Sequence, residues 1–305
     1  MLRYTLRQVQ YFVAAADHGS IRAAAEAVHV SQAGLSLALT ELEKALGVQL
    51  AVRHKAKGIT LTSAGTRFLS EARTLLRQAE ELQAATSEAP GELSGPLAIG
   101  CYSTLAAFWV PPITAGFAAA HPRLSLSLTE GAPAKLQADM LDGQLDAVLT
   151  HTRHLVPGAD HQVVRAARPY VLVGAGHRLA GRAGVRLSEL ANDDMVLLDI
   201  PSVRDNQLPN LRDSGLEPKI AWRSTSFEAV RGMVARGLGY TVLVQRPPQD
   251  ASYEGLPLVC LPIEGPIGHS DICFAYPAGQ RPSLKLQALI DYCAAYTPPT
   301  AGSLT

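Results

Sequence analysis

Between Ser20 and Gly47 the chain reads SIRAAAEAVHVSQAGLSLALTELEKALG. Ser20 and Ser31 each stand immediately before a helical apolar pattern, and serine is a favoured helix cap because its hydroxyl accepts a hydrogen bond from a free backbone N–H. The second pattern places four leucines on one stripe: Leu35, Leu39, Leu42 and Leu46. Gly47 is a typical helix end. The segment therefore predicts two short helices joined by a tight polar turn, the layout of a helix-turn-helix.

A further helix is expected before this pair, from about residue 5 to residue 17, and His18-Gly19 would end it. Its apolar residues gather on one side: Leu6, Val9, Phe12, Val13 and Ala16. The N-terminal part is thus predicted to be helical.

The second helix of the pair also has an unusual outer face. At 100° per residue, Ala33, Leu37, Thr40 and Lys44 lie opposite the leucine stripe, and Gln32 and Ser36 flank them. Apolar residues on such a face suit the major groove of DNA, where they can contact thymine methyl groups and a glutamine can pair with adenine. The alternative is a helix packed on both sides within a larger bundle.

The segment that follows, residues 50–62, predicts two short strands around Lys55–Gly58 that would form a β-wing. Its basic side chains would contact phosphates, which positions a protein on DNA without reading sequence. An ordinary basic loop is the alternative. Residues 1–67 hold eight Lys/Arg and four Asp/Glu, a net charge of +4, and the rest of the chain carries −4. Such a basic head on a mildly acidic body suits a polyanion bound at one end.

The candidate DNA-binding residues lie on the predicted helix pair and the wing: Ser20, Arg22, Ser31, Gln32, Ala33, Ser36, Leu37, Thr40, Arg53, Lys55 and Lys57.

From Ser63 to about Glu88 the chain predicts one long helix with a heptad stripe. The stripe consists of Phe68, Ala72, Leu75, Ala79, Leu82 and Thr86. A long helix with an apolar stripe between two domains favours pairing with a second copy, although packing on its own domain is the alternative. Residues 89–96 contain two prolines and two glycines and predict a boundary.

Beyond this boundary strands alternate with helices, which predicts an α/β fold. Strands are expected over residues 97–101, 124–128, 145–150, 170–174, 195–199, 221–224, 240–244, 257–261 and 271–276. Helices are expected over residues 104–120, 134–142, 209–214, 227–236 and 283–295.

Composition narrows the function classes. Apolar residues make up 47% of the chain, but no run reaches the ~18 residues of a membrane-spanning helix, and no signal-peptide pattern opens the sequence. The cysteines, Cys101, Cys260, Cys273 and Cys293, show no C-x-x-C spacing, so buried thiols in a reducing cytoplasm are expected, with no metal and no cofactor. We find no Gly-rich phosphate loop, no G-x-S-x-G and no H-E-x-x-H, and therefore expect no enzyme.

The head resembles the LysR-type transcriptional regulators. The motifs that carry the resemblance are Leu6–Val13 (LRQVQYFV), Gly19-Ser20, Ala23–Ala25, Ser31-Gln32, Leu35-Ser36, Leu42-Glu43, Leu46–Val48 and Leu61–Gly65 (LTSAG). Weaker marks follow in the expected order: Leu97–Gly100, Phe117 with His121-Pro122, Leu128–Gly131, Gly143–Asp146, Leu190-Ala191 and Ala235–Tyr240. One departure concerns the recognition helix, where Ala33, Leu37 and Ala38 stand in place of the family's usual proline and Arg-Gln pair.

The resemblance implies an α/β protein with an N-terminal, mainly helical winged helix-turn-helix, and an effector part of two Rossmann-like lobes like a type 2 periplasmic binding protein. The expected division is 1–62 for the DNA-binding domain, 63–90 for the linker and dimerisation helix, and 94–305 for the effector domain. Lobe I would comprise about 94–163 and 267–305, and lobe II about 164–266. The family usually forms a dimer of dimers, and RNA polymerase is a possible further partner.

The resemblance also implies an effector between the lobes. Strand C-termini and helix N-termini of α/β lobes attract anions, because free amides and the helix dipole meet there. The candidate effector residues occupy such positions: Tyr102, Ser103, Thr104, Glu130, Gly131, Thr150, His151, Pro201, Ser202, Ser224, Thr225 and Ser226. Helix capping is the alternative role for each serine and threonine.

The expected function is therefore a cytoplasmic DNA-binding regulator whose lobes respond to a small organic anion by a population shift. No cysteine lies between Cys101 and Cys260, so a peroxide-type disulfide switch in lobe II is not expected. Two other classes compete with this interpretation: an enzyme with an N-terminal regulatory head, and an architectural DNA binder without an effector.

Overall fold

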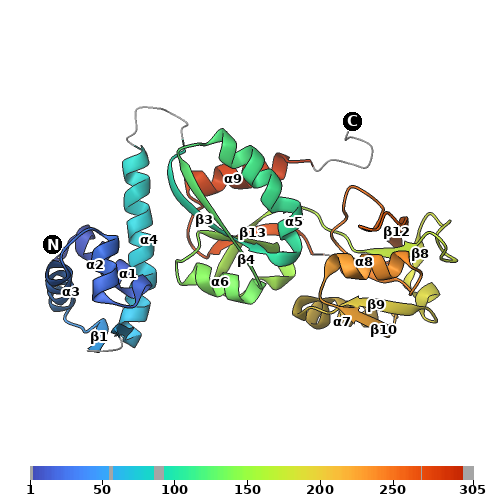
Figure 1. Cartoon of the computed structure of the whole chain (residues 1–305), viewed down its shortest axis with the longest axis horizontal. Helices are drawn as coiled ribbons and strands as arrows, with labels where there is room; N and C mark the ends of the chain where they lie inside the picture. The colour runs from blue at the N-terminus through green and yellow to red at the C-terminus, as the bar shows by residue number, and fades with distance from the viewer. Residues whose placement is uncertain (1–2, 55–57, 86–92, 269, 298–305) are drawn as a thin grey trace.

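The structure is a computed structural model that describes residues 3–54, 58–85, 93–268 and 270–297. Its parts lie in a row (Figure 1): a helical N-terminal domain, the long helix α4 (Ser63–Ala85), and two groups of strands and helices. We call the group next to α4 lobe I and the distal one lobe II.

The N-terminal domain contains α1 (Leu6–His18), α2 (Ile21–Ala27) and α3 (Gln32–Leu46). The expected caps are present: the Ser20 hydroxyl accepts from the Ala23 amide at 3.1 Å, and Ser31 caps α3 in the same way. Gly47 ends α3 in the left-handed region, with φ at 70°. The helix-turn-helix expected from the sequence is therefore confirmed.

The expected strand pair is also present, as β1 (Ala51–His54) and antiparallel β2 (Gly58–Leu61). The carboxylate of Glu43 on α3 accepts hydrogen bonds from the Leu50 and Ala51 amides at 2.8 and 3.0 Å. This carboxylate holds the start of the wing against the recognition helix.

Helix α4 uses its apolar stripe in two ways. Phe68 packs on the N-terminal domain with its ring 5.3 Å from that of Phe12, and Ala72 is buried. Further along, Leu75 is 37% exposed and Leu82 is 71% exposed. The first half of the stripe thus packs within the chain, and the second half leaves leucines on the surface. Thr86 lies outside the described residues.

Polar contacts join α4 to lobe I. Arg77 donates to the Asp146 carboxylate at 3.0 Å, and the second oxygen of that carboxylate accepts from the Ala98 amide at 2.7 Å. Arg73 donates to the Asp142 carbonyl at 2.7 Å and also to the carboxylate of Asp17 on α1. Arg73 therefore connects the N-terminal domain with the effector part.

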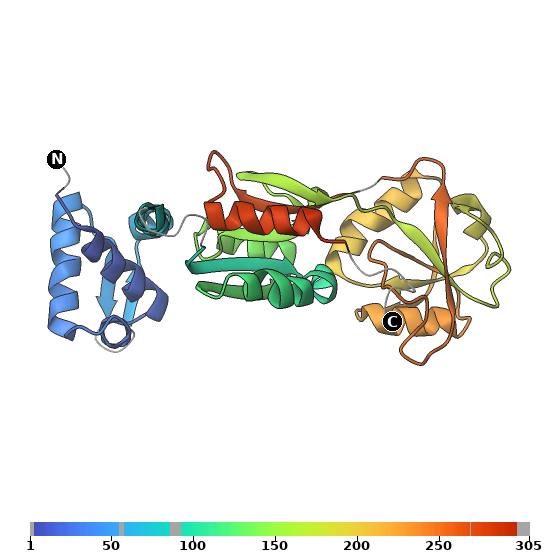
Figure 2. The ribbon, with the colours of Figure 1, turned by 90° about the horizontal axis from the view of Figure 1, so that it is seen from above.

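Lobe I is built on a five-stranded mixed sheet in the order β4-β3-β5-β13-β6. Its strands are β3 (Gly95–Tyr102), β4 (Leu124–Gly131), β5 (Ala147–His151), β6 (Ala159–Arg165) and β13 (Ile272–Pro277). Its helices are α5 (Ser103–Pro112) with its π-helical continuation η1 (Ile113–Ala118), α6 (Pro133–Leu141) and α9 (Leu284–Ala295). Figure 2 shows α9 and α5 beside this sheet.

Lobe II holds a four-stranded sheet, β11-β7-β12-β8, and a parallel pair, β10-β9. Its strands are β7 (Tyr170–Gly174), β8 (Val185–Arg186), β9 (Asp194–Leu198), β10 (Lys219–Ser224), β11 (Thr241–Leu243) and β12 (Leu258–Glu264). Its helices are η3 (Leu187–Leu190), η4 (Val203–Gln207), α7 (Leu208–Asp213) and α8 (Phe227–Ala235). A bridge between Met195 and Tyr240 links β9 to the start of β11.

The expected strands and helices of both lobes are confirmed, with ends that differ by a few residues. The sequence pattern missed β6, β8 and the short helical turns, among them η2 (Thr152–His154). The two-residue β8 is too short to show a period, and β6 reads ADHQVVR, in which polar residues dominate. Among the described helices, none has the length and apolar character needed to cross a membrane.

Candidate functional site

Helix α3 is the outermost element of the N-terminal domain, on the side away from α4 (Figure 1). Gln32, Ala33 and Leu37 are exposed on it, and Leu37 is 63% exposed. An apolar side chain this open, on a helix that faces solvent, is available to contact a partner such as the edges of DNA bases.

Arg53 of the wing reaches across to this helix. It donates to the Ser36 hydroxyl at 2.8 Å and to the Thr40 hydroxyl at 3.0 Å. Three residues that the sequence proposed for DNA binding thus form one polar cluster on the exposed side of the domain.

The remaining candidates of the head have other surroundings. Ser20 and Ser31 occupy cap positions, and Arg22 forms an exposed ion pair with Glu26 at 3.0 Å. Lys55 and Lys57 lie outside the described residues.

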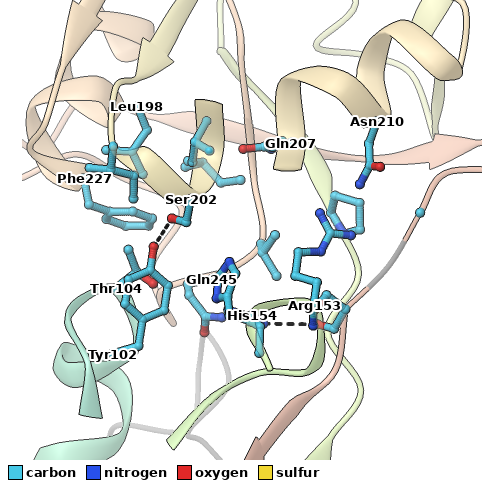
Figure 3. A pocket seen from close by; sticks show the side chains of 18 of the residues that line it. Tyr102, Thr104, Arg153, His154, Leu198, Ser202, Gln207, Asn210, Phe227 and Gln245 are labelled. Carbon is cyan, nitrogen blue, oxygen red and sulfur yellow. Dashed lines mark hydrogen bonds between the residues drawn. The ribbon is translucent and has the colours of Figure 1, made fainter. Parts of the chain in front are cut away.

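The second candidate site is a cavity between lobe I and lobe II (Figure 3), which encloses about 730 Å³ of space when its open part is included. Four residues from the expected effector set line it: Tyr102, Thr104, His151 and Ser202. Tyr102 and Thr104 come from the β3–α5 junction of lobe I, and Ser202 precedes η4 of lobe II. The expectation that ligands bind at strand ends therefore identified four of the residues that line this cavity.

The other expected effector residues do not line it: Ser103, Glu130, Gly131, Thr150, Pro201, Ser224, Thr225 and Ser226. Internal hydrogen bonds engage several of them. The Ser103 hydroxyl donates to the Gly131 carbonyl at 3.2 Å, and the Ser226 hydroxyl caps α8 by accepting from the Ala229 amide. Thr150 is fully buried within β5.

Sequence reasoning missed several polar lining residues: Arg153, His154, Gln207, Asn210, Gln245 and Ser270. Arg153 and His154 follow His151 within one short turn, so a wider window after each strand end would have included them. Gln207 and Asn210 lie within helical segments of lobe II, where no local sequence pattern marks them.

Arg153 is the one Lys, Arg, Asp or Glu among the described residues that line the cavity. With its amide turned so that the oxygen faces Arg153, Asn210 accepts hydrogen bonds from both terminal guanidinium nitrogens at 2.8 and 3.0 Å. The buried Nε has no hydrogen-bond partner within the described part of the chain. Burial lowers the pKa of Arg153, because desolvation disfavours its charged form.

Two histidines stand beside this arginine. Burial, together with repulsion from His151 and Arg153, lowers the pKa of His154 to about 4. Burial also lowers the pKa of His151, although its Nδ1 lies 3.1 Å from the Ser270 carbonyl. Both imidazoles are therefore neutral at pH 7, and they add no charge to the cavity.

Contacts across the cavity join the lobes. The hydroxyls of Tyr102 and Ser202 share a hydrogen bond, drawn in Figure 3, and Arg153 meets Asn210 of α7. Close by, the rings of Phe108 and Phe227 meet edge to face at 5.9 Å. A molecule in the cavity would alter or compete with these contacts, so the site is placed where occupancy can change the angle between the lobes.

The four cysteines are free thiols in surroundings that disfavour the thiolate. Burial raises the pKa of Cys101, Cys273 and Cys293 to about 12, and the half-buried Cys260 is raised to about 12 by burial and by Asp250. Because the thiolate is the nucleophilic form, these cysteines are poor sites for oxidation.

Two known family models match this chain, one over the N-terminal domain and one over the two lobes. The family model of the bacterial regulatory helix-turn-helix protein, lysR family, matches residues 6–66, and that of the LysR substrate binding domain matches residues 90–298. A hydrogen peroxide-inducible genes activator of Dickeya chrysanthemi is 32% identical over 295 residues, which cover 94% of this chain and 93% of that protein.

Two solved structures from Pseudomonas aeruginosa are also similar. The LysR family transcriptional regulator HinK is 33% identical, with a TM-score of 0.63, over 95% of this chain and 97% of that one. Full-length OxyR C199D has a TM-score of 0.76 over 96% of this chain and 98% of that one, and at 24% identity it supports the fold alone.

Proposed function

Because the chain belongs to the LysR family of DNA-binding transcriptional regulators, we propose that its affinity for an operator is controlled by a small organic anion bound in the cavity between the lobes. The observation that carries this proposal is the charge of the cavity. Arg153 lines it, the buried Nε of Arg153 has no hydrogen-bond partner among the described residues, and no acidic side chain among the described lining residues neutralises its charge.

On the DNA side, we assign base contacts to Gln32, Ala33 and Leu37, which are exposed on α3. Arg53 holds Ser36 and Thr40 beside them and is itself placed to reach a phosphate. Lys55 and Lys57 are proposed as further phosphate contacts, and Ser20, Arg22 and Ser31 as contacts from the start of α2 and α3.

The mechanism we propose is a population shift. The anion binds one arrangement of the lobes more tightly than the other, and that arrangement becomes dominant. Arg73 and Arg77 then transmit the change, because they join lobe I to α4 and α1. Contact with RNA polymerase is a possible downstream step.

For assembly, we propose a dimer formed through the exposed part of the α4 stripe, with Leu75 and Leu82 at its interface, and a dimer of dimers as the complete form. The proposed division of labour follows the sequence: residues 1–62 bind DNA, 63–90 link and dimerise, and 94–305 bind the effector. The proposed place of action is the cytoplasm.

Although a relative's name refers to hydrogen peroxide, we propose a reversibly bound effector for this chain and no peroxide reaction. Cys260 is the one cysteine in the sequence between Cys101 and Cys273, and the pKa of all four thiols is raised. We likewise propose that the chain acts by binding and not as an enzyme.

The test uses the full chain. Operator fragments are selected from genomic DNA, and their affinity is measured by fluorescence anisotropy with and without a panel of carboxylates, phosphate esters and matched amines. We expect at least one organic anion to change operator affinity by about tenfold, a usual size for coupling between two sites. Arg153→Gln should remove this response, so that its operator affinity is the same with and without the anion.

Operator affinity that no compound changes would contradict the effector and favour an architectural DNA binder. A response to hydrogen peroxide, with loss of free thiols, would contradict the proposed binding mode.

A further inference from the structure

We propose that the effector is an amphipathic monoanion, with one carboxylate held by Arg153 and an apolar body seated against lobe II. This inference rests on the proposed function and narrows it to a chemical class. It follows from the separation of charge and apolar surface within the cavity.

The polar end is formed by Arg153 and Asn210, which lie together on one side in Figure 3. The amide oxygen of Asn210 occupies the two terminal nitrogens of the guanidinium, and the buried Nε remains unpartnered. A guanidinium has five N–H donors in a plane, so a carboxylate can bind the edge that includes Nε while Asn210 keeps its own contact. Asn210 thereby fixes the orientation of the arginine for an incoming anion.

The opposite end holds apolar side chains of lobe II beside the hydroxyls of Tyr102, Thr104 and Ser202, and it has no charged side chain among the described lining residues. Figure 3 shows Leu198 and Phe227 on the far side of the cavity from Asn210. The apolar side chains of lobe II that line the cavity include Leu198, Ile200, Val203, Phe227, Leu243 and Val244. A ligand that fills this end gains from burying apolar surface, at about 25 cal/mol for each Å² removed from water.

The cavity is equipped for one negative charge. A second carboxylate would need another cation, and His151 and His154 are neutral because burial lowers the pKa of each. An amine would meet Arg153 as a like charge. A dicarboxylate and a cation are therefore both disfavoured, since an unpaired buried charge is costly.

The experiment compares two matched series by isothermal titration calorimetry on the full chain. One series has a six-carbon body: hexanoate, hexanamide, hexylamine and adipate. The other has an aromatic body: phenylacetate, phenylacetamide, phenethylamine and phenylmalonate. In at least one series we expect the monocarboxylate to bind tenfold or more tightly than its three counterparts, roughly the worth of one charge-assisted hydrogen bond.

Three variants localise the effect. Arg153→Gln should weaken the monocarboxylate by about tenfold and leave the amide unchanged, since it removes only the charged contact. Asn210→Asp should also weaken it, because a resident carboxylate would then occupy the guanidinium. Val244→Thr keeps the shape of the side chain and adds a hydroxyl. It should weaken the binding of ligands whose apolar body reaches this residue.

Arg204→Gln is the matched control. Arg204 lies in η4 and directly follows the lining residue Val203. It pairs with Asp199 at 2.7 Å and does not line the cavity. Its loss removes one positive charge from lobe II and should leave ligand affinity unchanged. Circular dichroism checks that each variant is folded. If Arg153→Gln does not fold, Asn210→Asp tests the contact with the carboxylate in its place.

Tighter binding of an amide, an amine or a dicarboxylate would overturn the inference, and so would an Arg153→Gln variant that binds the monocarboxylate as the wild type does. Failure of all eight compounds to bind would overturn it as well. The proposed function is tested separately, because it fails when no organic anion changes operator affinity, whichever of these compounds bind.

Discussion

At the residue scale, the DNA interface that we propose separates base reading, assigned to α3, from phosphate contact, assigned to Arg53. Gln32 is exposed at the first position of the helix, and its amide can pair with adenine. We expect Gln32→Ala to cost roughly 1–3 kcal/mol at the specific site and much less on random DNA. Fluorescence anisotropy on both DNAs measures this difference. An equal loss on both would show that Gln32 does not read sequence.

Arg53, which donates hydrogen bonds to Ser36 and Thr40, should behave differently, because we propose that it contacts a phosphate and no base. Arg53→Ala is expected to weaken specific and random DNA by similar factors and to reduce the salt dependence of binding by about one unit of slope. Affinity titrations between low and moderate salt test this. A loss confined to the specific site would instead assign a base contact to Arg53.

His154, which lines the cavity, makes the stability of the fold depend on pH. Burial lowers its pKa to about 4, below the ordinary value of 6.5, so the folded state binds fewer protons than the unfolded state between these limits. The free energy of unfolding is therefore unaffected by this group above pH 6.5. It decreases as the pH falls from 6.5 toward 4, by about 3 kcal/mol at most, because only the unfolded state binds the proton in this range. The pKa of His151 is lowered too and acts in the same direction.

We accordingly expect the free energy of unfolding of His154→Gln to fall less steeply than that of the wild type between pH 6.5 and pH 4. Urea titrations at several pH values measure the slope. Parallel curves for the two proteins would show that His154 is not the group responsible.

At the element scale, α4 is the shared support of head and effector part. Arg77 and Asp146 lie 3.0 Å apart with both side chains mostly buried, and Asp146 also accepts from the Ala98 amide at the start of the lobe I sheet. Arg77→Gln leaves this carboxylate with a weaker partner. We expect ligand binding to persist while its effect on operator affinity shrinks, and faster hydrogen exchange in α4. The exposed Arg67, changed to Gln, is the control on the same helix.

Such elements differ in how far sequence predicts them. The helices of the head were predictable because each starts with a hydroxyl cap and carries a clear apolar period. Strand β6 was not, since it lies at the edge of its sheet and its residues are largely polar. The cavity was predictable only in part, because a serine before a helix has the same local pattern whether it lines the cavity, as Ser202 does, or caps the helix, as Ser226 does.

The outer half of α4 carries the prediction about assembly. Leu75 and Leu82 are exposed on one stripe, a cost that a second copy would remove by covering them. Leu75→Glu should convert dimers to monomers and abolish operator binding, because two heads are needed for two half-sites. Sedimentation velocity measures the change, with Glu80→Ala on the opposite side of α4 as the control. A Leu75→Glu protein that remains dimeric would place the interface elsewhere.

At the scale of the whole molecule, control requires two lobes whose relative position has more than one stable value. The hydrogen bond between Tyr102 and Ser202 stabilises the arrangement seen here, since each hydroxyl belongs to a different lobe and both line the cavity. A ligand that prefers another arrangement must break this bond, and one that prefers this arrangement gains from it. The bond therefore enters the affinity of any effector.

A double-mutant cycle of Tyr102→Phe and Ser202→Ala isolates this contribution. We expect a coupling energy of about 0.5–1.5 kcal/mol in effector affinity, the usual range for one hydrogen bond. Titration calorimetry on the four proteins measures it. Tyr102→Phe combined with Ser224→Ala is the control cycle, because Ser224 does not line the cavity, and its effects should be additive. Additive effects in the first cycle as well would show that effector binding does not depend on this link, and closure of the lobes would then rest on Arg153 with Asn210 and on the Phe108–Phe227 contact.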